Sequence, residues 1–167
     1  MTAATTVAII ADTHLPKGKR GLPDACVRRI VRADLVIHLG DFSTVPTYEE
    51  IGALGPELVA VHGNVDEPAL TELLPAERTV EADRARIALT HDAGPKTGCL
   101  HRLRTRFPDA DAVVFGHSHI PLHERAPDGF QIFNPGSPTD RRRQPRHTMG
   151  CARTDAAGGL EFELVEL

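Results

Sequence analysis

Small groups of acidic, amide and imidazole side chains recur along the sequence, each shortly after a run of apolar residues. The donors that stand out are Asp12, His14, Asp41, Asn64, His91, His117 and His119. Imidazole is a ligand for manganese, iron, cobalt, nickel and zinc, whereas magnesium sites are built mostly from oxygen. Seven donors are too many for one tetrahedral ion, but they suit two divalent ions that share a bridging carboxylate. The residue types therefore predict a two-metal centre.

Spacing gives a first indication of how the donors are arranged. Asp12 and His14 lie two residues apart after an apolar run, so both side chains can face one ion. Glycine precedes or adjoins three of the other donor groups, at Gly40, Gly63 and Gly116. Because glycine tolerates conformations that other residues avoid, we expect sharp backbone turns beneath the ions.

The apolar runs before these donors are typical of buried strands, rich in β-branched residues. They cover residues 5–11, 35–39, 58–61, 85–90 and 112–115. Apolar residues at helical spacing predict helices over residues 23–33, 47–54 and 97–107. Antiparallel strands are predicted over residues 130–133 and 148–165, with a turn at Gly158-Gly159. Ligands of open α/β sheets bind beyond the carboxyl ends of the strands, so five strand ends should bring the donors to one region.

Composition limits the class of protein. The chain has 167 residues, 41% hydrophobic and 25% charged, which suits one globular domain over residues 1–167. A net charge of -4 argues against extended binding of nucleic acid. No apolar run approaches the roughly 18 residues that a membrane span needs. Three widely spaced cysteines, without a CxxC motif, indicate isolated reduced thiols and a cytoplasmic protein.

Six short motifs, read in order, resemble those of the calcineurin-like metallophosphoesterase superfamily. They are DTH at 12–14, GD at 40–41, GNVD at 63–66, TH at 90–91, GHSH at 116–119 and NPGS at 134–137. Each motif alone is weak, whereas all six in this order, over nearly the whole chain, are specific. NPGS points to the small single-domain phosphodiesterase branch of bacteria and archaea. The resemblance implies a four-layer αββα sandwich, in which two mixed β-sheets pack face to face between helices.

The same resemblance distributes the donors over two ions. On the first ion it places Asp12, His14 and His119. On the second it places Asn64, His91 and His117, with Asp41 as the bridge. Asp66 would orient the loop from behind. Manganese is the favoured metal, with nickel, cobalt, iron and zinc as alternatives.

The implied activity is hydrolysis of small phosphodiesters, nucleotide-like compounds among them, by a hydroxide held between the two ions. Asp41, Asn64 and His117 would lie at the reacting centre. Val65 stands where larger family members carry a histidine thought to protonate the leaving group. His62 could replace that histidine, although a structural role is favoured. Asp92 follows His91 where the family usually has glycine, and we interpret it as a loop cap.

Three other functions stay open on the sequence. A phosphomonoesterase of the same fold would use the same metal clamp. A non-catalytic, protein-binding scaffold is the second, since one eukaryotic relative of the small branch is a subunit of a sorting coat. The third is a nucleotide-binding module without turnover. The arginines at 141–143 are interpreted as a solvated loop in preference to a rim that steers phosphate. A monomer and a homo-oligomer are both compatible with the sequence.

Overall fold

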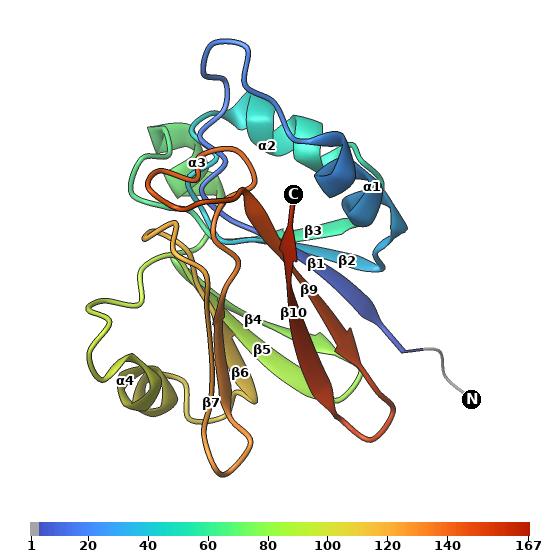
Figure 1. Cartoon of the computed structure of the whole chain (residues 1–167), viewed down its shortest axis with the longest axis vertical. Helices are drawn as coiled ribbons and strands as arrows, with labels where there is room; N and C mark the ends of the chain where they lie inside the picture. The colour runs from blue at the N-terminus through green and yellow to red at the C-terminus, as the bar shows by residue number, and fades with distance from the viewer. Residues whose placement is uncertain (1–3) are drawn as a thin grey trace.

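Two five-stranded mixed sheets form the centre of the computed structural model, which describes residues 4–167 (Figure 1). The first sheet has the strand order β10-β9-β1-β2-β3. Its strands are β1 (Thr6–Ile10), β2 (Leu35–His38), β3 (Glu57–Ala60), β9 (Thr148–Thr154) and β10 (Leu160–Glu166). β1, β2 and β3 are parallel, with Val7 opposite Leu35 and Leu35 opposite Glu57. β9 and β10 extend this sheet in antiparallel pairing, and Gly158-Gly159 lie in their turn as predicted.

The second sheet has the order β4-β5-β6-β8-β7. Its strands are β4 (Glu77–Ala82), β5 (Ala85–Thr90), β6 (Ala112–Val114), β7 (Leu122–Arg125) and β8 (Gln131–Asn134). The central strands β5, β6 and β8 are parallel, whereas the edge strands β4 and β7 are antiparallel to their neighbours.

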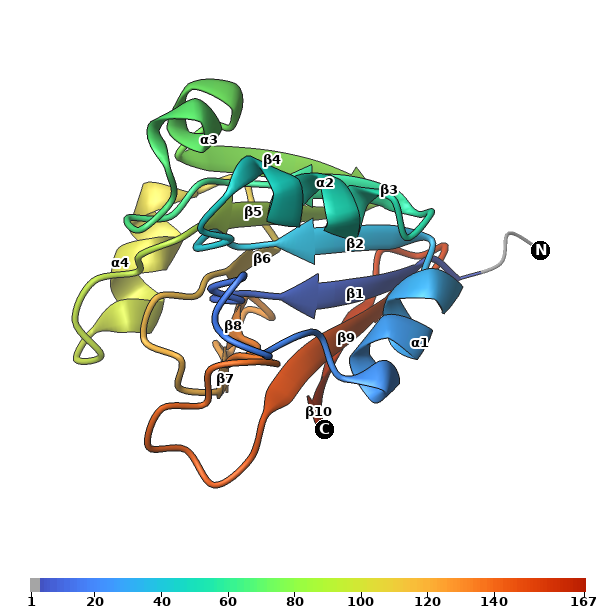
Figure 2. The same ribbon diagram turned by 90° about the horizontal axis from the view of Figure 1, so that it is seen from above.

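Helices cover the outer faces of both sheets. α1 (Asp24–Arg32), α2 (Val45–Gly52) and α3 (Pro68–Leu73) pack on the first sheet, and α4 (Cys99–Arg106) packs on the second. Between the sheets, fully buried side chains from both inner faces interdigitate, among them Ile9, Ile37, Ile87 and Phe133. The predicted four-layer αββα sandwich is confirmed (Figures 1 and 2).

Three elements are absent from the sequence-based prediction. α3 has only six residues, too few for a periodic apolar pattern. β4 and β7 are edge strands whose side chains are mostly exposed or half-buried, and charged residues such as Glu77 and Arg125 occupy them. Charged side chains protect an edge strand from pairing with another chain, but they also remove the apolar signal that identifies a strand. The predicted start of α2 was also late, because Thr44 caps the helix by accepting a hydrogen bond from the Thr47 N–H.

In both sheets, the carboxyl ends of the parallel strands lie at the same edge of the sandwich. Figure 2 shows β1 and β2 side by side, with their carboxyl ends toward the same side. His91, directly after β5, lies with Nδ1 2.6 Å from the carbonyl oxygen of Leu39, directly after β2. This contact joins the strand ends of the two sheets, and the predicted donors lie around it.

Two further expectations concern membrane spans and cysteines. Between residues 4 and 167, no helix is both long and apolar enough to cross a bilayer. Cys26, Cys99 and Cys151 are free thiols, as their spacing predicted.

Candidate metal centre

All seven predicted donors lie in loops that follow strands, and the fold brings them together. In the first sheet, Asp12 and His14 follow β1, Asp41 follows β2 and Asn64 follows β3. In the second sheet, His91 follows β5, and His117 and His119 follow β6. Most of the cluster is buried, while Asn64 and His117 are exposed. The centre is therefore open to solvent on the side of Asn64 and His117.

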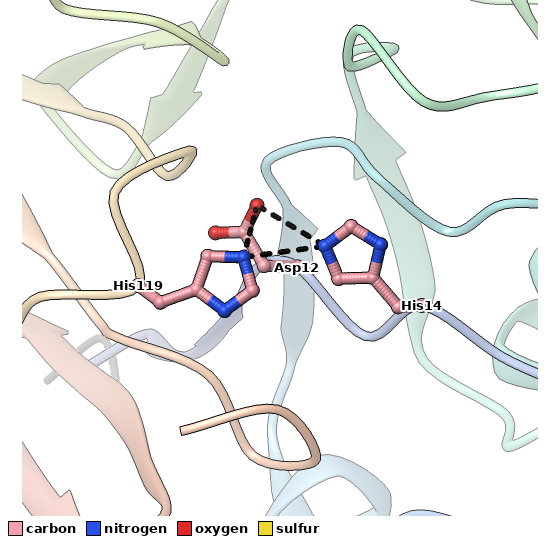
Figure 3. A group of neighbouring side chains, drawn as sticks. All are labelled: Asp12, His14 and His119. Carbon is pink, nitrogen blue, oxygen red and sulfur yellow. Dashed lines mark hydrogen bonds and ion pairs between the residues drawn. The ribbon is translucent and has the colours of Figure 1, made fainter. Parts of the chain in front are cut away.

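One group consists of Asp12, His14 and His119, whose side chains point toward one another (Figure 3). The Nε2 atoms of the two histidines are 3.2 Å apart. Asp12 Oδ1 lies 3.6 Å from His119 Nε2 and 4.0 Å from His14 Nε2. Two ring nitrogens and a carboxylate oxygen thus surround one point, the arrangement expected of ligands around a single ion.

A second group consists of Asp12, Asp41 and His91. His91 Nε2 is 3.4 Å from Asp41 Oδ2, 4.0 Å from Asp12 Oδ1 and 3.0 Å from Asn64 Oδ1. His117 Nδ1 lies 3.0 Å from the same oxygen of Asn64, so both exposed donors adjoin this group.

The two groups share carboxylates. Asp12 belongs to both, and Asp41 Oδ2 also lies 3.6 Å from His14 Nε2 in the first group. The resemblance assigned only Asp41 to a bridging position, whereas the geometry places two carboxylates between the groups. The structure therefore has two candidate His/Asp metal sites in contact, as a dinuclear centre requires.

The carboxylate of Asp12 tests whether these residues fit metal ions. Asp12 is fully buried, and neither of its side-chain oxygens has a hydrogen-bond partner within residues 4–167. A buried carboxylate without hydrogen bonds or a counter-charge is strongly unfavourable, and buried charges are typically paired or bound to metals. Divalent cations would satisfy both oxygens, so the donor set fits them.

The histidine tautomers agree with this reading. His91 and His119 each place Nδ1 against a backbone carbonyl, of Leu39 at 2.6 Å and of Asp140 at 2.5 Å. A carbonyl only accepts, so Nδ1 carries the proton and Nε2 of the neutral ring presents a lone pair to the centre. Histidine ligands are commonly held this way by a second hydrogen bond, which also fixes the orientation of the ring.

The pKa values indicate that positive charge stabilises the centre. Burial raises the pKa of Asp12 to about 7, although the charge of His91 opposes this shift. Burial also acts to raise the pKa of Asp41, but the interaction with His91 and the Val65 N–H lower it to about 2. Burial lowers the pKa of His91, yet the two carboxylates outweigh burial and raise it to about 8. Without metal, a proton on His91 therefore supplies part of the charge that cations would provide.

Strained backbone marks the same loops. Five of the seven donors have left-handed φ angles between 47° and 67°: Asp12, His14, Asp41, His117 and His119. Such conformations cost non-glycine residues of order 1–3 kcal/mol each, and they persist where the surrounding structure holds them, often at functional sites.

Asp66 orients the loops behind the donors, as expected. Its carboxylate accepts hydrogen bonds from the backbone N–H groups of Asp41, Gly63 and Ser43, at 3.0, 2.7 and 2.8 Å. Of the three glycines beside the donors, Gly40 has a positive φ, of 91°, as expected of a sharp turn, whereas Gly63 and Gly116 are needed for space. A Cβ on Gly63 would lie 2.0 Å from Asp41 Oδ1.

Substituting Gly63 with alanine is therefore expected to displace the Asp41 carboxylate and weaken metal binding. Disturbing the residues that orient a ligand typically costs ~10–100-fold in metal affinity. Calorimetric titration of the metal-free variant with manganese would measure the loss. Gly52→Ala is the matched control, because a Cβ there meets only Leu58 Cδ2, at 3.8 Å. Equal affinities in the two variants would contradict this role of Gly63.

The NPGS motif has a structural role that the sequence did not reveal. Asn134 Nδ2 donates to the carbonyl of Gly116 at 3.0 Å, which holds the loop of His117 and His119. Ser137 Oγ donates to the carbonyl of Asp12 at 2.8 Å. Asp140 follows shortly after and holds His119. The motif contributed to the family resemblance, but only the fold shows that this segment ties two donor loops together, that of Asp12 and that of His117 and His119.

The remaining candidates lie beside the centre. The ring of His62 is half-buried, with Nδ1 3.2 Å from the carbonyl oxygen of Gly63. Asp92 Oδ1 accepts the Gly94 N–H at 2.8 Å, so Asp92 caps its loop as interpreted from the sequence. Val65 donates its backbone N–H to Asp41 Oδ1 at 2.9 Å, while its side chain is 51% exposed.

Comparison with known proteins places this site in a family context. The model of the calcineurin-like phosphoesterase superfamily domain matches residues 6–157. A "probable metallophosphoesterase" of Methanothermobacter thermautotrophicus is 30% identical over 135 residues, covering 80% of this chain and 77% of the relative. A second, from Methanocaldococcus jannaschii, is 31% identical over 164 residues, covering 96% of this chain and 81% of the relative.

Solved structures share the fold. Vacuolar protein sorting 29 of Cryptosporidium parvum superposes with a TM-score of 0.79 at 18% identity, covering 98% of each chain. A structure described as a novel archaeal phosphodiesterase gives a TM-score of 0.68 at 20% identity, covering 96% of this chain and all of the other. At these identities the likeness establishes the fold alone.

Proposed function

Because the chain belongs to the calcineurin-like phosphoesterase superfamily, we propose that it is a dinuclear-metal phosphodiesterase that hydrolyses small phosphodiesters. The observation that carries the proposal is the buried Asp12 carboxylate, whose two oxygens have no hydrogen-bond partner among residues 4–167 and lie among imidazole nitrogens. This arrangement supports divalent cations as the partners of Asp12.

In this proposal, the first ion would be held by Asp12, His14 and His119, and the second by Asn64, His91 and His117. Asp41 would serve both ions, and Asp12 also adjoins the second group. Bound divalent cations supply a Lewis acid that activates water and stabilises negative charge on phosphoryl oxygens. Manganese is our preferred metal, because carboxylate and amide oxygens accompany the imidazoles in the donor set.

The chain's own residues prepare the site for an anion. Only two carboxylates, Asp12 and Asp41, would face the four positive charges of two divalent ions. The net positive charge that results attracts a phosphate diester. Asn64 and His117 are exposed, so they border the face on which substrate arrives. The diester preference rests on the family resemblance and on Val65, which stands in place of the histidine of larger members.

Arg142 supports binding of the phosphate. Among the three consecutive arginines, Arg141 donates to the carbonyl of Gln144 at 2.6 Å, whereas Arg142 makes no ion pair within the described residues 4–167. Burial lowers the pKa values of His14 and His119, and the charge of Arg142 lowers both further. Its positive charge therefore acts on the centre, and an anion bound there would be stabilised by it.

Arg142→Ala is accordingly expected to raise the KM for a phosphodiester roughly tenfold, because one charge-assisted contact is lost. The same change should weaken inhibition by inorganic phosphate to a similar extent. Steady-state kinetics on the metal-loaded protein measure both. Arg143→Ala is the matched control and should leave both constants unchanged; equal effects of the two variants would show that only general surface charge matters.

His62 lies on the loop of Asn64, so donation of a proton to the leaving alcohol, the less favoured of its two roles on the sequence, is a testable alternative to a structural role. His62→Gln should then slow diesters with alkyl leaving groups, which need a proton, by about 10–100-fold. A p-nitrophenyl leaving group departs as an anion, so its release should change little. An equal loss on both kinds of substrate would remove His62 from this role.

Metal reconstitution tests the proposed function directly. Chelator-treated protein would receive manganese, nickel, cobalt, zinc or magnesium singly and be assayed on bis(p-nitrophenyl) phosphate and p-nitrophenyl phosphate. We expect metal-dependent turnover, greatest with manganese and faster on the diester, that His117→Ala abolishes. Faster turnover of the monoester would instead favour the phosphomonoesterase. Absence of turnover with every metal, in folded protein that binds two ions, would overturn the enzyme and favour a binding protein or scaffold.

A further inference from the structure

A small cavity adjoins the candidate metal centre at His117. Its volume is about 120 Å³, and its walls come from the loop between β5 and α4 and the loop between β6 and β7, with the first residues of α4 and β7. His117 lines it together with Ala93, Phe115, Ile120 and Leu122. Because His117 belongs to both the cavity and the donor cluster, the cavity lies directly beside the centre.

Two apolar side chains directly after donors are exposed, where polar side chains are more usual. Ile120 follows the donor His119 directly and is 50% exposed. Val65, which follows Asn64, is 51% exposed. A single exposed apolar residue is ordinary on a protein surface. Two of them directly after donors, one of them lining a cavity, indicate a surface that contacts an organic group.

The charges of the lining exclude a second anionic group. Asp92 and Lys96 are its acidic and basic residues, one of each sign, so they give the cavity no net charge. One oxygen of Asp92 is already occupied by the Gly94 N–H. A further phosphate or carboxylate would therefore find no net attraction here, whereas an uncharged group would be stabilised by the apolar walls.

We propose that this cavity binds one ester group of the substrate, and that this group is a single uncharged ring. An apolar cavity of roughly 150 Å³ accommodates one benzene molecule, so a slightly smaller cavity that is open on one side suits one ring. Fused or branched groups would exceed it. The inference rests on the proposed function, because the phosphoryl group must lie at the metal centre for an ester group to reach the cavity.

Binding of two simple diesters tests the inference. Diphenyl phosphate and dimethyl phosphate carry the same single charge and differ only in their ester groups, which are phenyl rings in the first and methyl groups in the second. Calorimetry on the manganese-loaded protein should give a Kd roughly tenfold or more lower for diphenyl phosphate, since burial of apolar area favours the ring. Ile120→Ser should reduce that preference roughly threefold or more and leave the Kd of dimethyl phosphate unchanged. Val31→Ser is the matched control, because Val31 is 52% exposed but lies on α1.

The outcomes separate this inference from the proposed function. Equal Kd values for the two diesters, or equal effects of Ile120→Ser and Val31→Ser, would overturn the cavity as a ring site. Turnover of bis(p-nitrophenyl) phosphate, measured in parallel, reports on the proposed function. Turnover without a ring preference would overturn only the cavity. A ring preference that depends on Ile120, without turnover, would support the cavity and overturn the phosphodiesterase.

Discussion

Asp41→Asn is expected to lower kcat/KM for a phosphodiester by on the order of 1,000-fold or more. Asp41 Oδ2 faces His91 Nε2 at 3.4 Å and His14 Nε2 at 3.6 Å, so its charge serves both candidate metal sites. The amide keeps the shape and can still accept the Val65 N–H, but it removes the negative charge. Both ions should then bind more weakly, and metal titration should show a reduced stoichiometry.

Asp83→Asn is the matched control for this experiment. Asp83 is also an aspartate with a left-handed φ, of 53°, but it lies in the turn between β4 and β5, at the opposite end of β5 from His91. Its substitution should leave kcat/KM and metal stoichiometry unchanged. If Asp41→Asn retained two ions and near-normal turnover, neither its assignment as the shared ligand nor the mechanism built on it would survive.

Asp12→Asn should have opposite effects on stability with and without metal. In the metal-free protein, burial raises the pKa of Asp12 to about 7, so its ionised form destabilises the fold. The neutral amide relieves this cost and should raise the Tm by on the order of 5 °C at pH 8. With metal, the wild type gains binding energy that the variant loses, so the order of Tm values should reverse.

The pH dependence of this difference follows from the direction of the shift. A carboxyl group with a raised folded-state pKa costs nothing at pH values below its unfolded pKa, and its full cost is reached above the folded value. The Tm gain of the metal-free variant should therefore be small near pH 4 and grow until about pH 7 to 8. Calorimetric scans across this range, in the presence of chelator, would measure it. A gain independent of pH would contradict the role of ionisation.

Asp34→Asn provides a control of the opposite sign. Its carboxylate accepts hydrogen bonds from the Thr6 N–H and hydroxyl, at 2.8 and 2.7 Å, and these lower the pKa of Asp34. Its substitution should lower the Tm, and metal should not alter the difference. The opposite Tm changes of Asp12→Asn and Asp34→Asn would show that the Asp12 carboxylate lowers the stability of the metal-free fold and is needed for metal binding. Stability given up at one position in this way is typical of functional sites.

Much of the donor set could be predicted from the sequence because each donor closely follows a recognisable strand. A buried strand followed by aspartate, asparagine or histidine is a short pattern, and parallel strands place such patterns at one edge of a sheet. His91 after β5 and Asp41 after β2 were identified in this way, although they belong to different sheets. Composition and periodicity alone indicated an α/β sandwich. The family resemblance of the six ordered motifs then implied the four-layer αββα arrangement.

The tertiary structure decided how those donors are used. Asp12 lies in both candidate sites and has no side-chain hydrogen-bond partner in the described part of the chain, a fact that depends on the positions of His14, His91 and His119 together. The carbonyls that fix the tautomers of His91 and His119 come from Leu39 and Asp140, 52 and 21 residues away. No pattern in the sequence identifies a backbone carbonyl as a partner, because every residue has one.

The edge strands and the cavity were equally beyond sequence reasoning. β4 and β7 carry the charged residues of exposed edges, so their strand character comes from pairing with β5 and β8 and not from their own composition. The cavity beside His117 exists only where the loops that follow β5 and β6 meet. Residue types that bind metal are thus determined by the sequence itself, whereas shared ligands, fixed tautomers and the shape beside the centre arise from contacts between segments far apart in the chain.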